Sequence, residues 1–165
     1  IVRAVKARVV DGVRGLGDQE LSHVLAGRIN PDVAFFGFEL TETAAVANIV
    51  RAESLIRRLR ELGFGVALDD FGRGLSSLTY LKTLPVTTLK IDGSFVRDVI
   101  GDDRSQAMLS AIVQLAHAMG LATVAECVES EQIQDITRRL GVEYGQGFHI
   151  GRPTPLDQVI AGLLG

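Results

Sequence analysis

Short apolar runs alternate with longer amphipathic stretches along this chain, a pattern typical of repeated strand–helix units in a parallel sheet or barrel. The apolar runs predict strands at residues 2–10, 34–39, 65–68, 88–92, 122–125 and 144–149. The amphipathic stretches predict helices at residues 18–27, 44–62, 78–82, 105–119, 130–140 and from 156 onward. On the helix at 44–62, the side chains expected to point inward are Val46, Ile49, Val50, Leu55, Ile56 and Leu59. Neither a linker nor a low-complexity segment interrupts the pattern, so we expect one α/β domain.

Composition and charge fit a soluble globular chain and narrow its partners. Apolar residues make up 47% of the 165 residues, charged residues 22%, and the net charge is −3. No basic stripe favours nucleic acid, and no apolar run approaches the roughly 20 residues that cross a bilayer. The single Cys127 cannot form an internal disulfide, which fits the cytoplasm. The start at Ile1 lacks an initiator Met and the layout of a signal peptide, so we expect the chain to begin within a longer protein.

Polar side chains stand at the ends of the predicted strands, where the functional groups of a parallel α/β barrel lie. These residues are Glu39, Asp69, Asp70, Lys90, Asp92, Glu126 and Gln146. Any one of the acidic residues is explained equally well as a cap for the helix that follows it. That explanation weakens when consecutive strands all end in this way, which favours a shared site.

Lys90 and the carboxylates indicate a cation site. Lys90 lies between two apolar residues of a short strand, so its ammonium must point at groups that compensate for its burial. Asp69 and Asp70 are adjacent in the sequence. With Glu39 and Glu126 from other strands, they would repel one another unless divalent cations lay between them. Hard oxygen ligands suit Mg²⁺, Mn²⁺ or Ca²⁺, and two such ions about 4 Å apart suit hydrolysis of a phosphodiester by in-line attack of a bridging water.

Five ordered motifs lie between residues 20 and 160. They are E-L-T-E at 39–42, D-D-F-G-R-G-L-S-S-L at 69–78, L-P-V-T-T-L-K-I-D-G-S-F-V at 84–96, V-A-E-C-V-E at 124–129 with Gln132, and the segment 141–155 that contains Q-G-F. In residue type, order and spacing they resemble the EAL family of cyclic di-GMP phosphodiesterases. The resemblance implies a TIM-type (β/α) barrel. Residues 1–165 would be a single EAL-type domain fragment with about six of the eight strands, from the third strand to the C-terminal helix.

The resemblance also implies roles for individual residues. The expected metal ligands are Glu39, Asp69, Asp70 and Glu126. The expected catalytic residues are Lys90, Asp69, Asp70 and Glu126, with Lys90 contacting the attacking water and steadying its developing charge. Gln146 and Asp92 are expected to contact the substrate. Glu42 and Glu129 are expected to support the ligands, and Glu42 would steady the glycine-rich loop after Asp70.

The cofactors and partners that the resemblance implies follow from these roles. A complete site would bind two Mg²⁺ or Mn²⁺ ions and hydrolyse cyclic di-GMP to linear pGpG. A homodimer is expected, with the loop after Asp70 near its interface. Sensory or diguanylate-cyclase domains are expected elsewhere in the parent protein.

The chain departs from the family pattern at several positions. The glutamate of the Glu-Ala-Leu segment and the asparagine of the third strand, both metal ligands in the family, are absent from residues 1–165. Arg73 stands in place of threonine, Leu75 and Phe148 in place of tyrosine, and Cys127 in place of glycine. Because missing ligands weaken metal affinity, we expect this chain by itself to have little or no activity.

Two other hypotheses stay open. In the first, the chain is a degenerate module that binds cyclic di-GMP or a protein without turnover. The absent asparagine, Arg73 and Leu75 favour this hypothesis. In the second, the chain is a remnant whose exposed sheet edges cause aggregation, which size-exclusion chromatography would detect.

Overall fold

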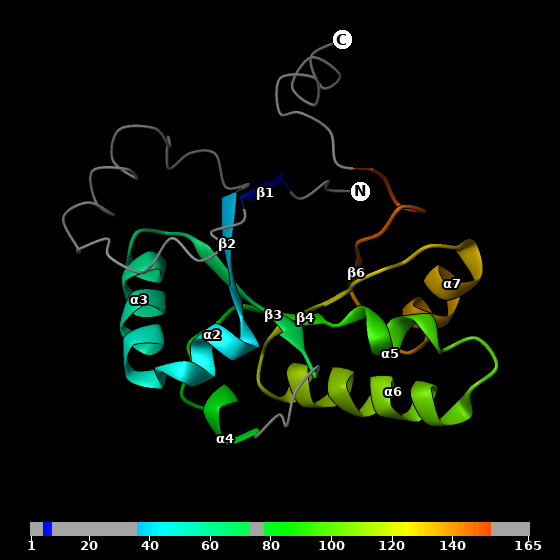
Figure 1. Ribbon diagram of the computed structural model, residues 1–165, viewed down its shortest axis with the longest axis horizontal. Coiled ribbons are helices and arrows are strands. Elements are labelled where there is room, and N and C mark those ends of the chain that lie inside the picture. The colour runs from blue at the N-terminus through cyan, green and yellow to red at the C-terminus, as the bar shows by residue number, and fades with distance from the viewer. Residues whose placement is uncertain (1–4, 8–35, 73–77, 153–165) are drawn as a thin grey trace, which may run out of the picture. The chain divides into compact units, whose positions relative to one another are not determined.

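The computed structural model describes residues 5–7, 36–72 and 78–152 of the chain (Figure 1). Several predictions lie outside these residues: the helix at 18–27, the terminal helix from 156, and the departures at Arg73 and Leu75. Among the described residues, no helix combines the length and the apolar character that crossing a membrane requires.

The strands form one sheet whose order follows the order of the chain, from β1 to β6. The pairings of β1 with β2, β4 with β5, and β5 with β6 are all parallel. From β1 to β6 the strands span Val5–Ala7, Phe36–Thr41, Gly65–Phe71, Thr88–Ile91, Ala122–Ala125 and Tyr144–Gly145. Each predicted strand therefore has an observed counterpart, and the parallel arrangement is the one that alternating strands and helices predict.

The chain divides into two compact units, which are described separately. Unit 1 consists of Ile1–Leu68 and Ser77–Val86, and unit 2 consists of Asp69–Ser76 and Thr87–Gly165. Strand β3 passes from unit 1 into unit 2 between residues 68 and 69. The expectation of a single domain stays a prediction.

Unit 1 contains two helices where the sequence predicted one at 44–62. Helix α2 spans Glu42–Ala47 and helix α3 spans Ile49–Glu61. Asn48 separates them because its backbone leaves the helical region at φ −153 and its side chain accepts a hydrogen bond from N of Arg51 at 3.1 Å. Asparagine is favoured at such a cap, since it satisfies one of the N–H groups that a helix leaves unpaired at its start.

Two of the side chains predicted to point inward on these helices are exposed. Ile56 and Leu59 are buried as predicted, but Val46 is 50% exposed and Val50 is 75% exposed. The prediction that these two valines point inward is wrong. Val46 lies before the break at Asn48. Val50 lies within α3, six residues before Ile56, and falls outside the face that Ile56 and Leu59 share because a helix turns about 100° per residue.

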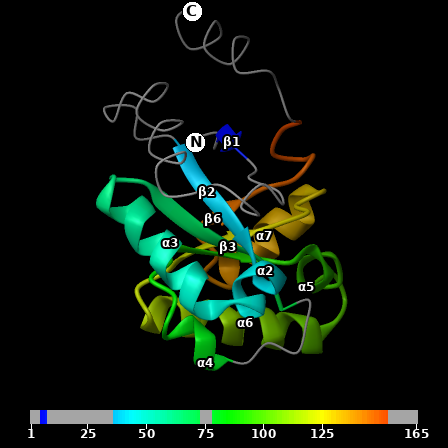
Figure 2. The same cartoon turned by 60° about the vertical axis from the view of Figure 1, so that its left-hand side comes forward.

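The described residues of unit 2 include three helices beside β4 and β5. Helix α5 spans Gly93–Arg97, α6 spans Asp103–Ala118 and α7 spans Glu131–Arg139, and α5 contacts both of the others (Figures 1 and 2). The core of the unit consists of Ile91, Val96, Val99, Leu109, Val113, Ala125, Val128, Ile133, Ile136 and Val142. The sequence predicted α6 and α7 closely. It missed α5, which is too short to show a period.

Candidate metal centre

Backbone hydrogen bonds just beyond the strands align the carboxyl ends of β3, β4 and β5 in unit 2. N of Asp92 donates to O of Phe71 at 3.2 Å, and N of Glu126 donates to O of Ile91 at 3.2 Å. N of Gln146 donates to the last residue of β5 at 2.8 Å. Residues that follow neighbouring parallel strands are therefore brought to one rim, as expected for the functional edge of such a sheet.

Asp69 and Asp70 are consecutive, yet their carboxylates lie in the same cluster. Successive side chains of an extended strand point to opposite faces of the sheet. Asp70 has φ 58, a left-handed conformation that breaks this alternation at the end of β3. Aspartate adopts this conformation more readily than most residues because its short polar side chain can form local hydrogen bonds. The turn therefore allows two adjacent carboxylates to serve one site.

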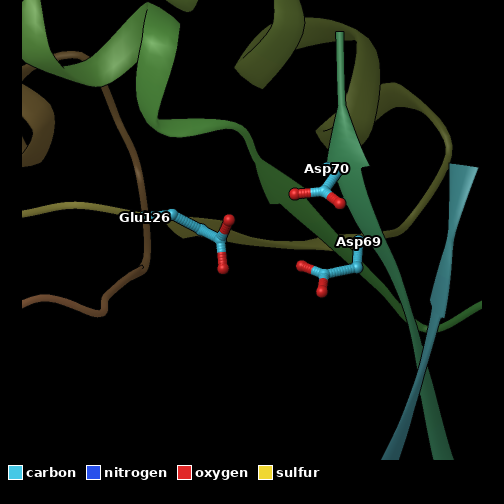
Figure 3. Close-up of side chains that lie close together, drawn as sticks. All are labelled: Asp69, Asp70 and Glu126. Carbon is cyan, nitrogen blue, oxygen red and sulfur yellow. The ribbon is translucent and has the colours of Figure 1, made fainter. Parts of the chain in front are cut away.

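Glu126 completes the cluster from the segment after β5. One carboxylate oxygen each from Asp69, Asp70 and Glu126 lie within 4.8 Å of one another. Figure 3 shows Glu126 reaching toward the two aspartates at the end of β3. Asp69 is almost fully buried, and the other two are half-buried.

Lys90 lies at the centre of this arrangement. Its side chain is buried in β4, and Nζ donates to Oδ1 of Asp69 at 2.5 Å and to Oε1 of Glu126 at 2.5 Å. These two ion pairs compensate for the burial of the ammonium, which would otherwise be costly. The lysine and the carboxylates thus occupy one site built from three neighbouring strands.

The donor set of this site fits a divalent cation. Three carboxylates outnumber the single ammonium among these four side chains, so the cluster retains an excess of negative charge. Carboxylate oxygens are the ligands that Mg²⁺, Mn²⁺ and Ca²⁺ prefer. Asp69, Asp70 and Glu126 could therefore hold such an ion, as the sequence predicted.

Glu39 and Glu42 belong to unit 1. Glu39 lies in β2, two residues before the strand ends, and its Oε2 is fully buried. Glu42 opens α2 and is 7% exposed, and its Oε1 accepts a hydrogen bond from the hydroxyl of Tyr80 at 2.5 Å. Tyr80 lies in α4, Leu78–Leu81, directly after residues 73–77. The ligand role of Glu39 and the supporting role of Glu42 stay predictions, and sequence reasoning missed Tyr80.

Three further predicted residues lie in unit 2 outside the carboxylate cluster. Asp92 caps α5, and its Oδ1 accepts a hydrogen bond from N of Ser94 at 2.9 Å. Helix capping is the alternative role that the sequence left open for each acidic residue at a strand end. Gln146 follows β6 and is exposed, and Glu129 is exposed after β5. Substrate contact by Asp92 and Gln146 and the supporting role of Glu129 stay predictions.

Sequence reasoning also missed the surroundings of Cys127. This residue has φ 57, and its Sγ accepts a hydrogen bond from a guanidinium nitrogen of Arg97 at 2.9 Å. Burial raises the pKa of the Cys127 thiol. The glycine that the family pattern has at this position is the signal that could have indicated a positive φ, and nothing in the sequence indicated Arg97.

Comparison with known proteins assigns the chain to a family. The family model described as EAL domain matches residues 17–153, more than half of the chain. The chain is 46% identical over 119 residues to "Cyclic di-GMP phosphodiesterase PdeB" of Shewanella oneidensis, a match that covers 72% of this chain and 14% of that protein.

Two solved structures share the fold. "PaMucR Phosphodiesterase, c-di-GMP complex" matches with a TM-score of 0.75 and 38% identity, over 86% of this chain and 57% of that one. "Klebsiella pneumoniae BlrP1 pH 9.0 manganese/cy-diGMP complex" matches with a TM-score of 0.74 and 28% identity, over 83% of this chain and 36% of that one. The chain therefore spans less than two thirds of each of these proteins. The predicted incomplete TIM-type α/β barrel is confirmed, and the chain belongs to the EAL domain family.

Proposed function

We propose that this chain is part of the catalytic domain of a phosphodiesterase that hydrolyses cyclic di-GMP to linear pGpG with a pair of divalent cations. The observation that carries the proposal is the position of Lys90 between Asp69 and Glu126, beside Asp70, at the ends of three adjacent strands. Membership of the EAL family supports it, since the two related structures are complexes with cyclic di-GMP and one of them also contains manganese.

Three carboxylates would hold the cations. Asp69, Asp70 and Glu126 are the ligands that the described cluster offers, and Glu39 is the further ligand that the family resemblance predicts. When bound, divalent cations polarise a phosphoryl oxygen and lower the pKa of a coordinated water. The protein's part is to hold the oxygen ligands at one rim, on strand ends whose backbone is fixed by hydrogen bonds.

Lys90 would act on the attacking oxygen. Its ammonium donates hydrogen bonds to Asp69 and Glu126 at the ends of two different strands, so the position of the positive charge is fixed before substrate binds. In hydrolysis, the water oxygen forms a bond to phosphorus, the bond from phosphorus to O3′ breaks, and O3′ leaves with a proton. A preorganised cation beside the attacking oxygen lowers the energy of the charge that develops there.

The wider setting of the proposal comes from the family. We expect the active protein to work in the cytoplasm as a homodimer, with sensory or diguanylate-cyclase domains in its parent protein. Gln146 and Asp92 would contact the dinucleotide from the same rim, next to the ends of β6 and β4.

Turnover of cyclic di-GMP in Mn²⁺, followed by chromatographic separation of pGpG, tests the proposal. In a parent protein that contains the Glu-Ala-Leu strand, we expect pGpG to form and Asp69→Asn to lower turnover by about a hundredfold or more. Asp135→Asn, at an exposed position of α7, is the matched control and should change little. Absence of pGpG from such a protein would overturn the proposal.

A binding module without turnover is the second candidate. The observation that favours it is the residue immediately after Glu126. Cys127 has a backbone φ of 57 and carries a side chain, whereas the family has glycine at this position. If the parent protein forms no pGpG, calorimetry with cyclic di-GMP in Ca²⁺ shows whether it still binds the dinucleotide. Binding there supports a receptor, and its absence supports a domain that interacts only with proteins.

A further inference from the structure

Glu126 begins a sharp turn that follows β5. On one side, N of Glu126 donates to O of Ile91 at 3.2 Å, and on the other, N of Val128 donates to O of Gln146 at 3.0 Å. Cys127 lies between these two hydrogen bonds with φ 57, a conformation that residues with a Cβ rarely adopt. The direction of the Glu126 carboxylate therefore depends on the contacts that keep Cys127 in this conformation.

The side chain of Cys127 is held by one face of α5. Gly93 makes room for it, because a Cβ built on Gly93 would lie 2.4 Å from Sγ of Cys127. Arg97 lies four residues further along the helix, and its guanidinium donates to the same sulfur at 2.9 Å. Residues at this spacing share a helix face. One face of α5 therefore provides both the space for the Cys127 side chain, at Gly93, and the hydrogen-bond donor to its sulfur, from Arg97.

We propose that Arg97 is a positioning residue for Glu126. By donating to Sγ of Cys127, it stabilises the left-handed turn and thereby aims the Glu126 carboxylate at Asp69 and Asp70. The inference rests on the proposed function in one respect, since it takes Glu126 as a metal ligand. It assigns a role to Arg97 that depends on the cysteine at position 127.

The sign of the effect on metal affinity separates this role from simple electrostatics. Arg97 carries a positive charge close to the segment that bears Glu126, so its charge alone opposes the binding of a cation. A purely electrostatic role predicts that Arg97→Ala tightens Mn²⁺ binding. A positioning role predicts the opposite, because the Glu126 carboxylate would leave its place in the cluster more often.

Calorimetric titration with Mn²⁺, in a parent protein that contains the Glu-Ala-Leu strand, tests the proposal. We expect Arg97→Ala to weaken Mn²⁺ affinity about tenfold, the usual size of an effect exerted through a ligand's neighbours. Arg97→Lys retains a donor and should recover most of the affinity. Arg138→Ala removes the same charge from an exposed position of α7 and is the matched control. Unchanged or tighter Mn²⁺ binding by Arg97→Ala overturns the proposal.

Two further measurements do not depend on metal binding. Hydrogen exchange of the amides of Glu126 and Val128 should become about tenfold faster in Arg97→Ala, the equivalent of one lost hydrogen bond, and should stay the same in Arg138→Ala. In a Cys127→Gly background, Arg97→Ala should change neither amide further, because the sulfur is gone. Equal exchange in all these variants contradicts the positioning role.

These readouts also separate the two proposals. If the unsubstituted parent protein, with its Glu-Ala-Leu strand, binds no Mn²⁺ while Arg97→Ala speeds exchange at Glu126, the proposed function fails and the positioning of the turn by Arg97 stands. If Mn²⁺ binds and neither affinity nor exchange responds to Arg97, the proposed function stands and the positioning role fails.

Discussion

The ammonium of Lys90 lies 2.5 Å from Oδ1 of Asp69, and the side chains of both residues are at least 95% buried. Buried ion pairs of this kind are costly to break, because the remaining partner keeps its charge away from water. The same pair stands at the centre of the proposed catalytic site. The contribution of the pair to stability is therefore measured without metal, and its contribution to the metal site is measured with metal present.

Replacing Lys90 by Met should destabilise the metal-free protein by about 3–5 kcal/mol, since Asp69 and Glu126 lose their common cation. Mn²⁺ should restore part of that loss by taking the place of the ammonium, while turnover stays low. Thermal unfolding in EDTA measures the destabilisation, and thermal unfolding in Mn²⁺ measures the recovery. Lys82→Met, at an exposed position of unit 1, is the control. A Mn²⁺-induced rise in Tm no larger than that of the unmodified protein would contradict the prediction.

Removing the hydroxyl of Tyr80 should destabilise unit 1. Tyr80 is 5% exposed and donates to Glu42 at 2.5 Å, so Tyr80→Phe loses a buried hydrogen bond to a carboxylate. We expect the free energy of unfolding to fall by about 1.5–3 kcal/mol, measured by urea denaturation. Tyr144→Phe makes the same change at a residue that is 57% exposed and should have little effect. Equal effects of the two substitutions would count against the hydrogen bond.

A methyl group at Gly147 should disturb the return of the chain after β6. A Cβ there would lie 2.2 Å from the backbone O of Val128, which cannot yield as a flexible side chain can. We expect Gly147→Ala to destabilise the protein by about 1–3 kcal/mol. Gly145→Ala is the matched control, because its nearest neighbour would be a side-chain carbon of Val128 at 3.4 Å. Similar melting temperatures for the two variants would contradict the prediction.

The stabilising contribution of Asp102 should depend on pH. The hydroxyl of Ser105 at 2.6 Å, followed by N of Arg104 at 2.9 Å, donates to its carboxylate and lowers the pKa of Asp102 below the ordinary value of 3.8. A lowered pKa in the folded state adds stability above the unfolded pKa, and that stability is lost as pH falls through the folded pKa.

Asp102→Asn tests this dependence because it keeps a cap and removes the charge. Its deficit in the free energy of unfolding, measured with urea, should be largest at neutral pH and should shrink as pH falls below 3.8. Ser105→Ala should reduce the dependence by removing the strongest donor. A deficit of constant size at all pH values would rule out the carboxylate as its source.

The order and type of most helices and strands can be read from the amino-acid sequence alone. Strands such as 65–68 and 122–125 are short runs of mostly apolar residues, and α7 has a clear amphipathic period between Ser130 and Gly141. These signals are local, because they arise from the repeat of a helix or strand and from caps next to it. The carboxylates at strand ends were also readable, since the direction of parallel strands alone places them at one rim.

Which side chains contact one another in the site follows from the folded arrangement and not from local sequence patterns. The partners of Lys90 lie 21 and 36 residues away, and the partner of Glu42 lies 38 residues away. The left-handed turns at Asp70 and Cys127 and the contact between Cys127 and Arg97 likewise depend on how separate segments pack. Periodicity carries no information about such contacts, because their free energy comes from side chains that folding brings together across the chain.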